Sequence, residues 1–253
     1  MMKVSIITVC FNSAKTIEDT LRSVLGQDYE NIEYVVVDGG STDATPSILK
    51  KYGRQIHKCI SEPDNGVYDA MNKGIALASG DIIATLNSDD IYASPTVVSR
   101  MVDLIKANNL DAAYADLAYI KGNDTDNIVR FWKTGYFQPG SFARGWVPPH
   151  PTFFCKKDVF GRYGYFRGDY HISADFELML RFFEKHQIDV GYLPEVIVNM
   201  RTGGKANVIT GIIKGNCEIF NAFKVNGLRF SPMFFLQKPF TKLAQLFKRP
   251  KPA

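Results

Sequence analysis

Four short strand-like runs alternate with helix-like segments over the first 90 residues, and this alternation limits the fold more than any other feature of the chain. The runs cover residues 4–9, 32–37, 56–61 and 82–86, and all but the third are mainly apolar and rich in β-branched residues, which favour strands. Apolar residues between the runs recur at helical spacing, as at Ile17, Leu21 and Val24. Strands and helices that alternate at this spacing predict an α/β fold with βαβ units and a mainly parallel sheet flanked by helices.

A polar turn directly follows each of the four runs. The turns cover residues 10–13, 38–43, 62–66 and 87–90. In open parallel sheets, ligands bind outside the carboxyl ends of the strands. We therefore expect the four turns to meet at one edge of the sheet and to form a ligand site there.

The stretch 82–90 ends an apolar run in an amide, a hydroxyl and two adjacent carboxylates. Two uncompensated carboxylates would repel each other, and a hard divalent cation removes that repulsion. Mg²⁺ or Mn²⁺ typically binds through one or two carboxylates together with substrate phosphates. At this point a second interpretation stays open, because a strand followed by a polar turn and a helix cap uses the same residue types.

Composition and missing motifs narrow the function classes. The 253 residues carry a formal net charge of +4 and are 45% hydrophobic, which is typical of a globular protein with one large core. Before the C-terminus, no Lys/Arg run interleaved with aromatics indicates a nucleic-acid partner. The four cysteines lack the paired spacing of a zinc site or a disulfide framework. The chain also has no dinucleotide-binding or Walker lysine motif, which disfavours dehydrogenases and P-loop enzymes.

The termini bear on localisation. No signal-like series opens the chain and no apolar stretch is long enough to span a membrane, so we expect a cytoplasmic protein. Residues 234–251 mix large apolar residues with lysine and arginine. Such a segment either lies peripherally on the anionic inner face of the cell membrane or packs on the domain or on a partner subunit, as in a homodimer.

Four ordered motifs resemble the family 2 glycosyltransferases, which have a GT-A type fold. They are Thr-Val-Cys-Phe-Asn at 8–12, Val-Asp-Gly-Gly-Ser-Thr-Asp at 37–43, Asn-Gly-Val-Tyr-Asp-Ala-Met-Asn-Lys-Gly at 65–74 and Leu-Asn-Ser-Asp-Asp at 86–90. The resemblance implies a Rossmann-like sheet with a nucleotide-sugar-binding part at 1–120. It also implies an acceptor-side and catalytic-base part of the same domain at 121–205, and a C-terminal helical extension at 206–253.

The same resemblance implies an inverting, metal-dependent glycosyltransferase that uses a nucleoside-diphosphate sugar. We expect a UDP-sugar donor and a glycan or lipid-linked acceptor in cell-surface polysaccharide biosynthesis. Carried over by position, the donor-binding residues are Thr8, Val9, Cys10, Phe11, Asn12, Asp38, Asp64, Asn87 and Ser88, with Asp38 on the base. Asp89 is the expected ligand for Mg²⁺ or Mn²⁺.

Two positions depart from the family pattern. Asn87 stands at the first position of the Asp-x-Asp motif, so Asp89 is the acidic residue left in register. Met71 stands where many relatives have an arginine, and we assign the phosphate contact to Lys73 instead. The alternative for Lys73 is a lysine that points to solvent.

Three further segments resemble functional positions of the family. His150 lies between prolines in a segment similar to His-Pro-x-x-Phe and is expected to contact diphosphate, metal or acceptor, with a structural hydrogen bond as the alternative. Asp175, near the start of an apolar-periodic helix, resembles the base that removes the acceptor proton, with Glu177 in reserve. Arg201 and Lys205 lie in a basic loop that resembles the loop closing over the donor in relatives. Either is expected to meet the diphosphate, with a surface turn as the alternative.

Two other functions stay open from the sequence. A metal-dependent nucleotidyltransferase also places nucleotide phosphates at parallel strand ends. A non-catalytic nucleotide-sugar-binding module is conceivable because of Asn87 and Met71.

Overall fold

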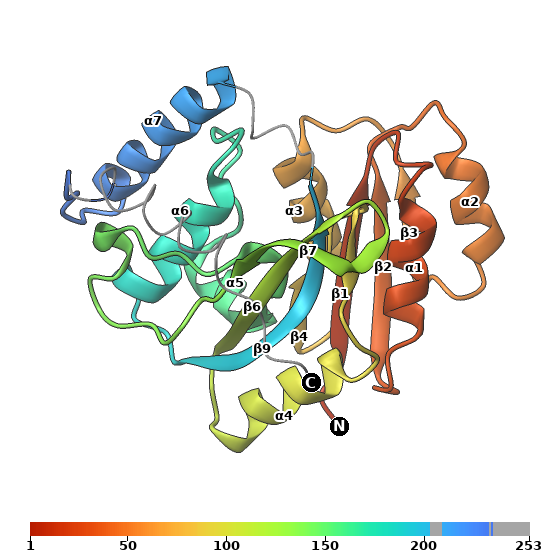
Figure 1. Cartoon of the computed structure of the whole chain (residues 1–253), viewed down its shortest axis with the longest axis horizontal. Coiled ribbons are helices and arrows are strands. Elements are labelled where there is room, and N and C mark those ends of the chain that lie inside the picture. Colours follow the sequence, from red (N-terminus) through yellow and green to blue (C-terminus); the bar gives the residue numbers. More distant parts are fainter. Residues whose placement is uncertain (203–208, 233, 235–253) are drawn as a thin grey trace.

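The computed structural model describes residues 1–202, 209–232 and 234. In this part of the chain nine strands form one sheet in the order β3-β2-β1-β4-β8-β6-β9-β5, with β7 paired to β6 (Figure 1). The strands are β1 Val4–Cys10, β2 Ile32–Asp38, β3 Lys58–Ser61, β4 Ile82–Thr85, β5 Asp90–Tyr92, β6 Ala112–Lys121, β7 Asp124–Trp132, β8 Phe154–Lys156 and β9 Val190–Arg201.

Helices cover both faces of this sheet (Figure 1). They are α1 Ile17–Leu25, α2 Thr45–Tyr52, α3 Val67–Leu77, α4 Val97–Ala107, α5 Lys157–Tyr163, α6 Ala174–Leu180 and α7 Ile209–Val225. Three short turns of helix, η1 Phe142–Arg144, η2 His150–Thr152 and η3 Arg181–Lys185, complete the described elements. The predicted α/β fold with flanking helices is confirmed.

The four predicted strands form the parallel half of the sheet. β1 pairs in parallel with β2 and β4, and β2 pairs in parallel with β3. The other half is mixed, since β8 runs antiparallel to β4 and β6, whereas β6 and β9 are parallel. The sequence places Asp90 in a turn, whereas in the structure it begins β5 and pairs with Met200 of β9. Because that pairing joins residues far apart in the chain, no local sequence pattern predicts it.

Two apolar layers sandwich the parallel strands. Ile7 and Val9 of β1 face the layer that contains α3, α6 and α7, whereas Val4 and Ile6 face the layer of α1, α2 and α4. Side chains of a strand alternate between its faces, so burial on both faces requires a continuous apolar run rather than an alternating one. This explains why the runs of β1, β2 and β4 are largely apolar, whereas β3, which is not fully buried, contains Lys58 and Ser61.

The C-terminal part is described as far as α7 and Phe234. Phe234 is buried and its ring packs against Phe176 and Phe223. The rest of the predicted amphipathic tail, residues 235–251, lies outside the described residues, as does Lys205. Within the described ranges, no helix is long and apolar enough to cross a membrane.

Candidate functional site

The loops that follow β1, β2, β3 and β4 interlock at the carboxyl ends of the strands, and we call these loops (residues 11–16, 39–44, 62–66 and 86–89) the rim. Asn12 Oδ1 accepts a hydrogen bond of 2.9 Å from the Thr42 N–H, which joins the first two loops. The Ser13 and Ser88 hydroxyl oxygens lie 2.8 Å apart and join the first loop to the fourth. The Glu62 N–H donates to the Asp38 carbonyl at 3.0 Å and joins the third.

Asp38 lies beneath the rim rather than on it. Its side chain is fully buried, and its Oδ1 accepts a 2.5 Å bond from the Ser41 hydroxyl. Its Oδ2 accepts a 2.6 Å bond from the Ser61 hydroxyl. With both oxygens occupied, Asp38 holds the loops after β2 and β3 together. In this conformation Asp38 is not exposed to a ligand, and its contact with a nucleobase stays a prediction.

The side chains of residues 8–10, at the end of β1, are buried. Thr8 is fully buried and its hydroxyl lies 3.0 Å from that of Tyr34. Val9 packs in the core, and the Cys10 thiol donates to Asp38 at 3.7 Å. The side chains of these three residues face the interior, whereas those of Phe11 and Asn12 are exposed, and the nucleoside contact of residues 8–12 stays a prediction. Phe11 is 58% exposed, and Asn12 is exposed with a φ of +50°.

Asp64 is the carboxylate that lies over the loop after β2. Its Oδ1 accepts the Gly66 N–H at 2.8 Å. Its Oδ2 would lie 2.3 Å from a Cβ placed on Gly39, and the Phe11 ring would lie 3.5 Å from the same Cβ. An exposed aromatic ring and a half-buried carboxylate therefore meet above Gly39, which is an arrangement suited to a nucleobase.

Asn87, Asp89 and Asp90 occupy the end of β4 and the start of β5. Asn87 Nδ2 donates to Asp90 Oδ2 at 3.0 Å, while Asp90 Oδ1 has no hydrogen-bond partner among the described residues. Burial raises the pKa of Asp90 well above its usual range, and the charge of Asp89 raises it further. Burial also raises the pKa of Asp89, against a lowering by Arg201. The amide at position 87 thus supplies a hydrogen that an aspartate there would lack.

Arg201 holds the backbone of this segment. Its Nη1 donates to the Asp89 carbonyl at 2.8 Å, and its Nη2 contacts Asp19 Oδ2 at 2.6 Å. Its Nε donates to Asn123 Oδ1 at 3.0 Å, and the side chain is buried. The structure thus uses Arg201 to position Asp89, and its expected contact with a diphosphate is not part of this arrangement.

The donor set at this end of the sheet fits a hard divalent cation. In the described chain, no three His, Cys, Asp or Glu side chains come together as a metal cage. Asp89 is half-buried, its pKa is raised by burial, and a cation next to it would favour the ionised form. Mg²⁺ and Mn²⁺ commonly bind through one carboxylate, water and substrate phosphates, which is the set available here.

Lys73 and Met71 lie on α3, which leaves the rim after Gly66. Lys73 Nζ lies 2.8 Å from Glu62 Oε1 and donates to the Pro63 carbonyl at 3.0 Å. Its charge is therefore paired with a carboxylate of the loop after β3. Met71 is buried in the core against β1 and β2. Neither side chain is free to take the place of a phosphate-binding arginine in this conformation.

A second cluster adjoins the rim and contains Asp175, Tyr68 and His150. The Tyr68 hydroxyl lies 3.1 Å from Asp175 Oδ1 and 2.7 Å from the Ile172 carbonyl. His150 Nε2 lies 3.4 Å from the hydroxyl of Thr85, the last residue of β4. Burial lowers the pKa of His150, although the charge of Asp175 raises it, so a neutral imidazole is favoured. The structure thus brings Asp175 and His150 to the same end of β4 as Asn87, Ser88 and Asp89.

Glu177 does not belong to this cluster. It is buried, and both its carboxylate oxygens lie 3.0 Å from the Arg181 guanidinium. Asn226 Nδ2 also donates to Glu177 Oε1 at 2.9 Å. The carboxylate is committed to packing α6 on α7, so its expectation as a reserve base is corrected.

Two residues that matter here were not singled out from the sequence. Tyr68 lies within the motif at 65–74, and its position two residues after the turn at 62–66 is the signal that the sequence offers. Glu218 of α7 accepts the N–H groups of His171, Ile172 and Ser173 at 3.0, 2.9 and 2.8 Å and so holds the loop before α6. No local sequence pattern predicts that contact, because Ser173 and Glu218 are 45 residues apart in the chain.

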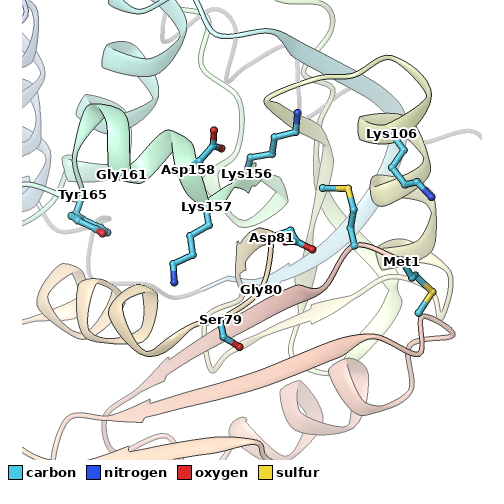
Figure 2. Close-up of a pocket in the computed structure, with 11 residues that line it drawn as sticks. Met1, Ser79, Gly80, Asp81, Lys106, Lys156, Lys157, Asp158, Gly161 and Tyr165 are labelled. Carbon is cyan, nitrogen blue, oxygen red and sulfur yellow. The ribbon is translucent and has the colours of Figure 1, made fainter.

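A hollow of about 930 Å³ lies at the opposite edge of the sheet, near the N-terminus (Figure 2). Lys106, Lys156 and Lys157 line it, but their side chains extend in different directions. Lys157 Nζ donates to the Ala78 carbonyl at the end of α3. Asp81 and Asp158 line the same hollow and offset its charge. The cations do not converge on one point, so the rim and its adjoining cluster form the candidate site.

The amino-acid sequence is similar to those of known glycosyltransferases. The profile described as glycosyl transferase family 2 matches residues 5–157. An uncharacterized glycosyltransferase of Mycobacterium tuberculosis is 34% identical over 183 residues, which cover 70% of this chain and 68% of the relative. The PGL/p-HBAD biosynthesis glycosyltransferase of Mycobacterium bovis is 28% identical over 217 residues, which cover 81% of this chain and 79% of the relative.

Solved structures share the fold. TarS 1–349 of S. aureus in complex with UDP-GlcNAc has a TM-score of 0.70 at 17% identity, over 93% of this chain and 69% of that one. The mannosyltransferase PcManGT of Pyrobaculum calidifontis, in complex with GDP-Man and Mn²⁺, has a TM-score of 0.66 at 20% identity, over 97% of this chain and 70% of that one. The GT-A type fold expected from the resemblance is confirmed.

Proposed function

The chain belongs to glycosyltransferase family 2, and on that premise we propose that it moves a sugar from a nucleoside-diphosphate donor to a hydroxyl group of a glycan or lipid-linked acceptor. The contacts that carry the proposal form a series from the end of β4 to Asp175. Thr85 contacts His150, the His150 and Tyr68 rings both pack on Phe166, and the Tyr68 hydroxyl contacts Asp175. A nucleotide held at the rim would thus have a carboxylate within reach of its sugar. A UDP-sugar is the donor we propose, and surface-polysaccharide biosynthesis is the setting.

The base and ribose would bind above Gly39, between the Phe11 ring and the Asp64 carboxylate. Aromatic stacking and a carboxylate that accepts a base N–H are the recognition chemistry available there. Asn12 and Ser88 would complete the donor site from neighbouring loops. This assignment replaces Asp38 with Asp64 as the proposed base-reading carboxylate.

Asp89 would hold a divalent cation, with Arg201 fixing its backbone. When bound, the cation neutralises the negative charge of the leaving diphosphate. Asp175 would take the proton of the acceptor hydroxyl while that oxygen attacks the anomeric carbon from the side opposite the diphosphate. The anomeric configuration would then invert.

Peripheral membrane contact is a further part of the proposal. In the described chain, α7 exposes Ile212, Ile213 and Phe220, each more than half exposed, next to Lys214 and Lys224. Apolar and cationic side chains together suit an anionic membrane surface. A glycolipid acceptor would be reached from such a surface.

The test combines donor screening with product analysis. UDP, UDP-GlcNAc and GDP-Man, with and without Mn²⁺, are first screened for thermal stabilisation, because a ligand of the native state raises the apparent stability. Turnover of the stabilising donor is then followed with Asp89→Ala and Asp175→Asn, and release of the free nucleoside diphosphate is the expected product. Pyrophosphate release would instead support nucleotidyl transfer. Full turnover by both variants would contradict the mechanism, and donor binding without any turnover would support the binding module.

A further inference from the structure

Tyr68 occupies an unusual position for a helix core residue. It is the second residue of α3, it is buried, and its hydroxyl faces two acceptors, the Ile172 carbonyl at 2.7 Å and Asp175 Oδ1 at 3.1 Å. A phenol has a single hydrogen to donate. That hydrogen can therefore serve one of the two acceptors at a time, and both acceptors belong to the segment that carries Asp175.

The two oxygens of Asp175 are held differently. Oδ1 accepts the Phe176 N–H at 2.8 Å in addition to the Tyr68 hydroxyl. Oδ2 has no hydrogen bond within the described ranges, and the side chain is half-buried rather than enclosed. The carboxylate is thus anchored through one oxygen, and the other remains available to a proton donor.

The Tyr68 ring is itself fixed. It stacks on Phe166 with a centroid distance of 5.6 Å and an interplanar angle of 25°. The Phe166 backbone is held by Asn72, whose Nδ2 donates to the Phe166 carbonyl at 2.8 Å and whose Oδ1 accepts the Phe166 N–H at 3.0 Å. Asn72 lies one turn along α3 from Tyr68, so the same helix carries the tyrosine and the residue that holds its stacking partner.

Among the described residues, no lysine or arginine forms an ion pair with Asp175. His150 from η2 faces it, and burial lowers the pKa of that imidazole. Glu218 from α7 adds a negative charge near Tyr68. In the described ranges the Asp175 carboxylate is therefore held by hydrogen-bond donors, and the Tyr68 hydroxyl is the one that comes from a different element.

We propose that Tyr68 is a positioning residue for Asp175, and that its hydroxyl anchors Oδ1 while the carboxylate is ionised. This inference rests on the proposed function. With Asp175 ionised, the hydroxyl donates to Oδ1 and turns Oδ2 toward the acceptor. The acceptor proton moves to Oδ2, the acceptor oxygen bonds to the anomeric carbon, and the bond from that carbon to the diphosphate oxygen breaks. As Oδ1 becomes a weaker acceptor, the hydroxyl hydrogen turns to the Ile172 carbonyl.

The experiment compares Tyr68→Phe with Tyr52→Phe. Tyr52 is an equally buried tyrosine at the end of α2 whose hydroxyl donates to Glu18 Oε1 at 2.8 Å, so its variant also loses a tyrosine–carboxylate bond. Turnover is measured as nucleoside diphosphate released from the stabilising donor among UDP-GlcNAc and GDP-Man, with Mn²⁺ and with water as acceptor. Tyr68→Phe should lower kcat about 10- to 100-fold at an unchanged KM for the donor, and should move the acidic limb of the pH–rate profile to higher pH. Tyr52→Phe should change neither.

A double variant separates this role from a structural one. If Tyr68 acts through Asp175, adding Tyr68→Phe to Asp175→Asn should lower kcat less than about twofold further, because coupled residues are not additive. Should Tyr68→Phe fail to fold, Phe166→Leu keeps the hydroxyl but loosens its ring, and a lower kcat at constant KM is expected. The inference would be overturned if Tyr68→Phe and Asp175→Asn lowered kcat multiplicatively. It would also be overturned if the Tyr68→Phe and Phe166→Leu enzymes both had the kinetics of Tyr52→Phe. Full turnover by Asp175→Asn would instead overturn the proposed base.

Discussion

The Asp64 carboxylate occupies the space in which a side chain at position 39 would begin, since a Cβ on Gly39 would lie 2.3 Å from Asp64 Oδ2. Real Cβ atoms do not approach an oxygen so closely, so any side chain at position 39 would displace the Asp64 carboxylate. Gly39 has an ordinary negative φ, unlike Gly40 with a φ of +82°. The constraint at position 39 is therefore steric. The close approach of Asp64 to Gly39 links the loop after β2 to the loop after β3.

Gly39→Ala should displace the Asp64 side chain and weaken nucleotide binding. The backbone accommodates alanine, so the fold should remain while the dissociation constant for UDP rises about tenfold, which corresponds to about 1.4 kcal/mol. Titration calorimetry with UDP and Mn²⁺ measures it. Gly161→Ala in α5 is the matched control, because a Cβ there meets nothing within 4 Å. Equal UDP affinity for both variants would contradict the proposed place of the base.

Replacing each aspartate by asparagine should separate recognition from structure. Asp64→Asn should weaken UDP binding while the free energy of unfolding changes by less than about 0.5 kcal/mol. Asp38→Asn should cost about 2 kcal/mol of unfolding free energy, because an amide group would face the hydroxyls of Ser41 and Ser61. Urea denaturation and calorimetry on the same samples measure both quantities. The reverse pattern would restore Asp38 as the base-reading residue.

Asn87→Asp should destabilise the protein although it restores an acidic Asp-x-Asp motif. The change removes the donor to buried Asp90 and places a third carboxylate beside Asp89 and Asp90. We expect a loss of about 2 kcal/mol without metal, largely recovered with Mn²⁺. Thermal unfolding with and without Mn²⁺ measures it. Asn31→Asp, on an exposed side chain before β2, adds the same charge and should show no such recovery. A variant at 87 that is as stable as wild type without metal would contradict this account.

Glu218→Gln should slow turnover from a distance. Glu218 accepts three consecutive N–H groups from residues 171–173, and an amide would oppose one of them with its own hydrogens. We expect a loss of about 2 kcal/mol in stability and a lower kcat at constant donor KM. Glu184→Gln is matched, since Glu184 accepts the N–H groups of Gly140 and Phe142 at 2.8 and 3.1 Å. If both variants lower kcat equally, the loop before Asp175 has no special part in turnover.

Glu33 should make stability depend on pH. Burial alone would raise the pKa of Glu33, but donors on Ser5 and Ser79 and the Lys58 ammonium lower it far below its usual range. A lowered pKa stabilises the fold above the unfolded-state pKa of about 4.3, and that stabilisation fades as pH falls below it. Glu33→Gln should cost about 3 kcal/mol at pH 7 and progressively less between about pH 5 and pH 3. Urea denaturation across this range measures it, and a constant difference would contradict the assignment.

The sequence alone determined the parallel half of the sheet and the family. Runs such as residues 32–37 predict strands, because their short length and β-branched content are typical of buried strands. The four ordered motifs specified the family because together they place glycines, carboxylates and amides after successive strands. These are local patterns, and a linear sequence displays local patterns directly.

Tertiary structure decided which of those side chains are available. The Asp38 carboxylate accepts hydrogen bonds from Ser41 and Ser61. The Arg201 guanidinium donates to Asp19, Asn123 and the Asp89 carbonyl. The Glu177 carboxylate accepts from Arg181 and Asn226. In the reverse sense, Tyr68 gained a contact with Asp175 across 107 residues of chain. Whether a polar side chain is available to a ligand depends on hydrogen-bond partners from distant elements. The local spacing of residues along the chain does not predict those partners.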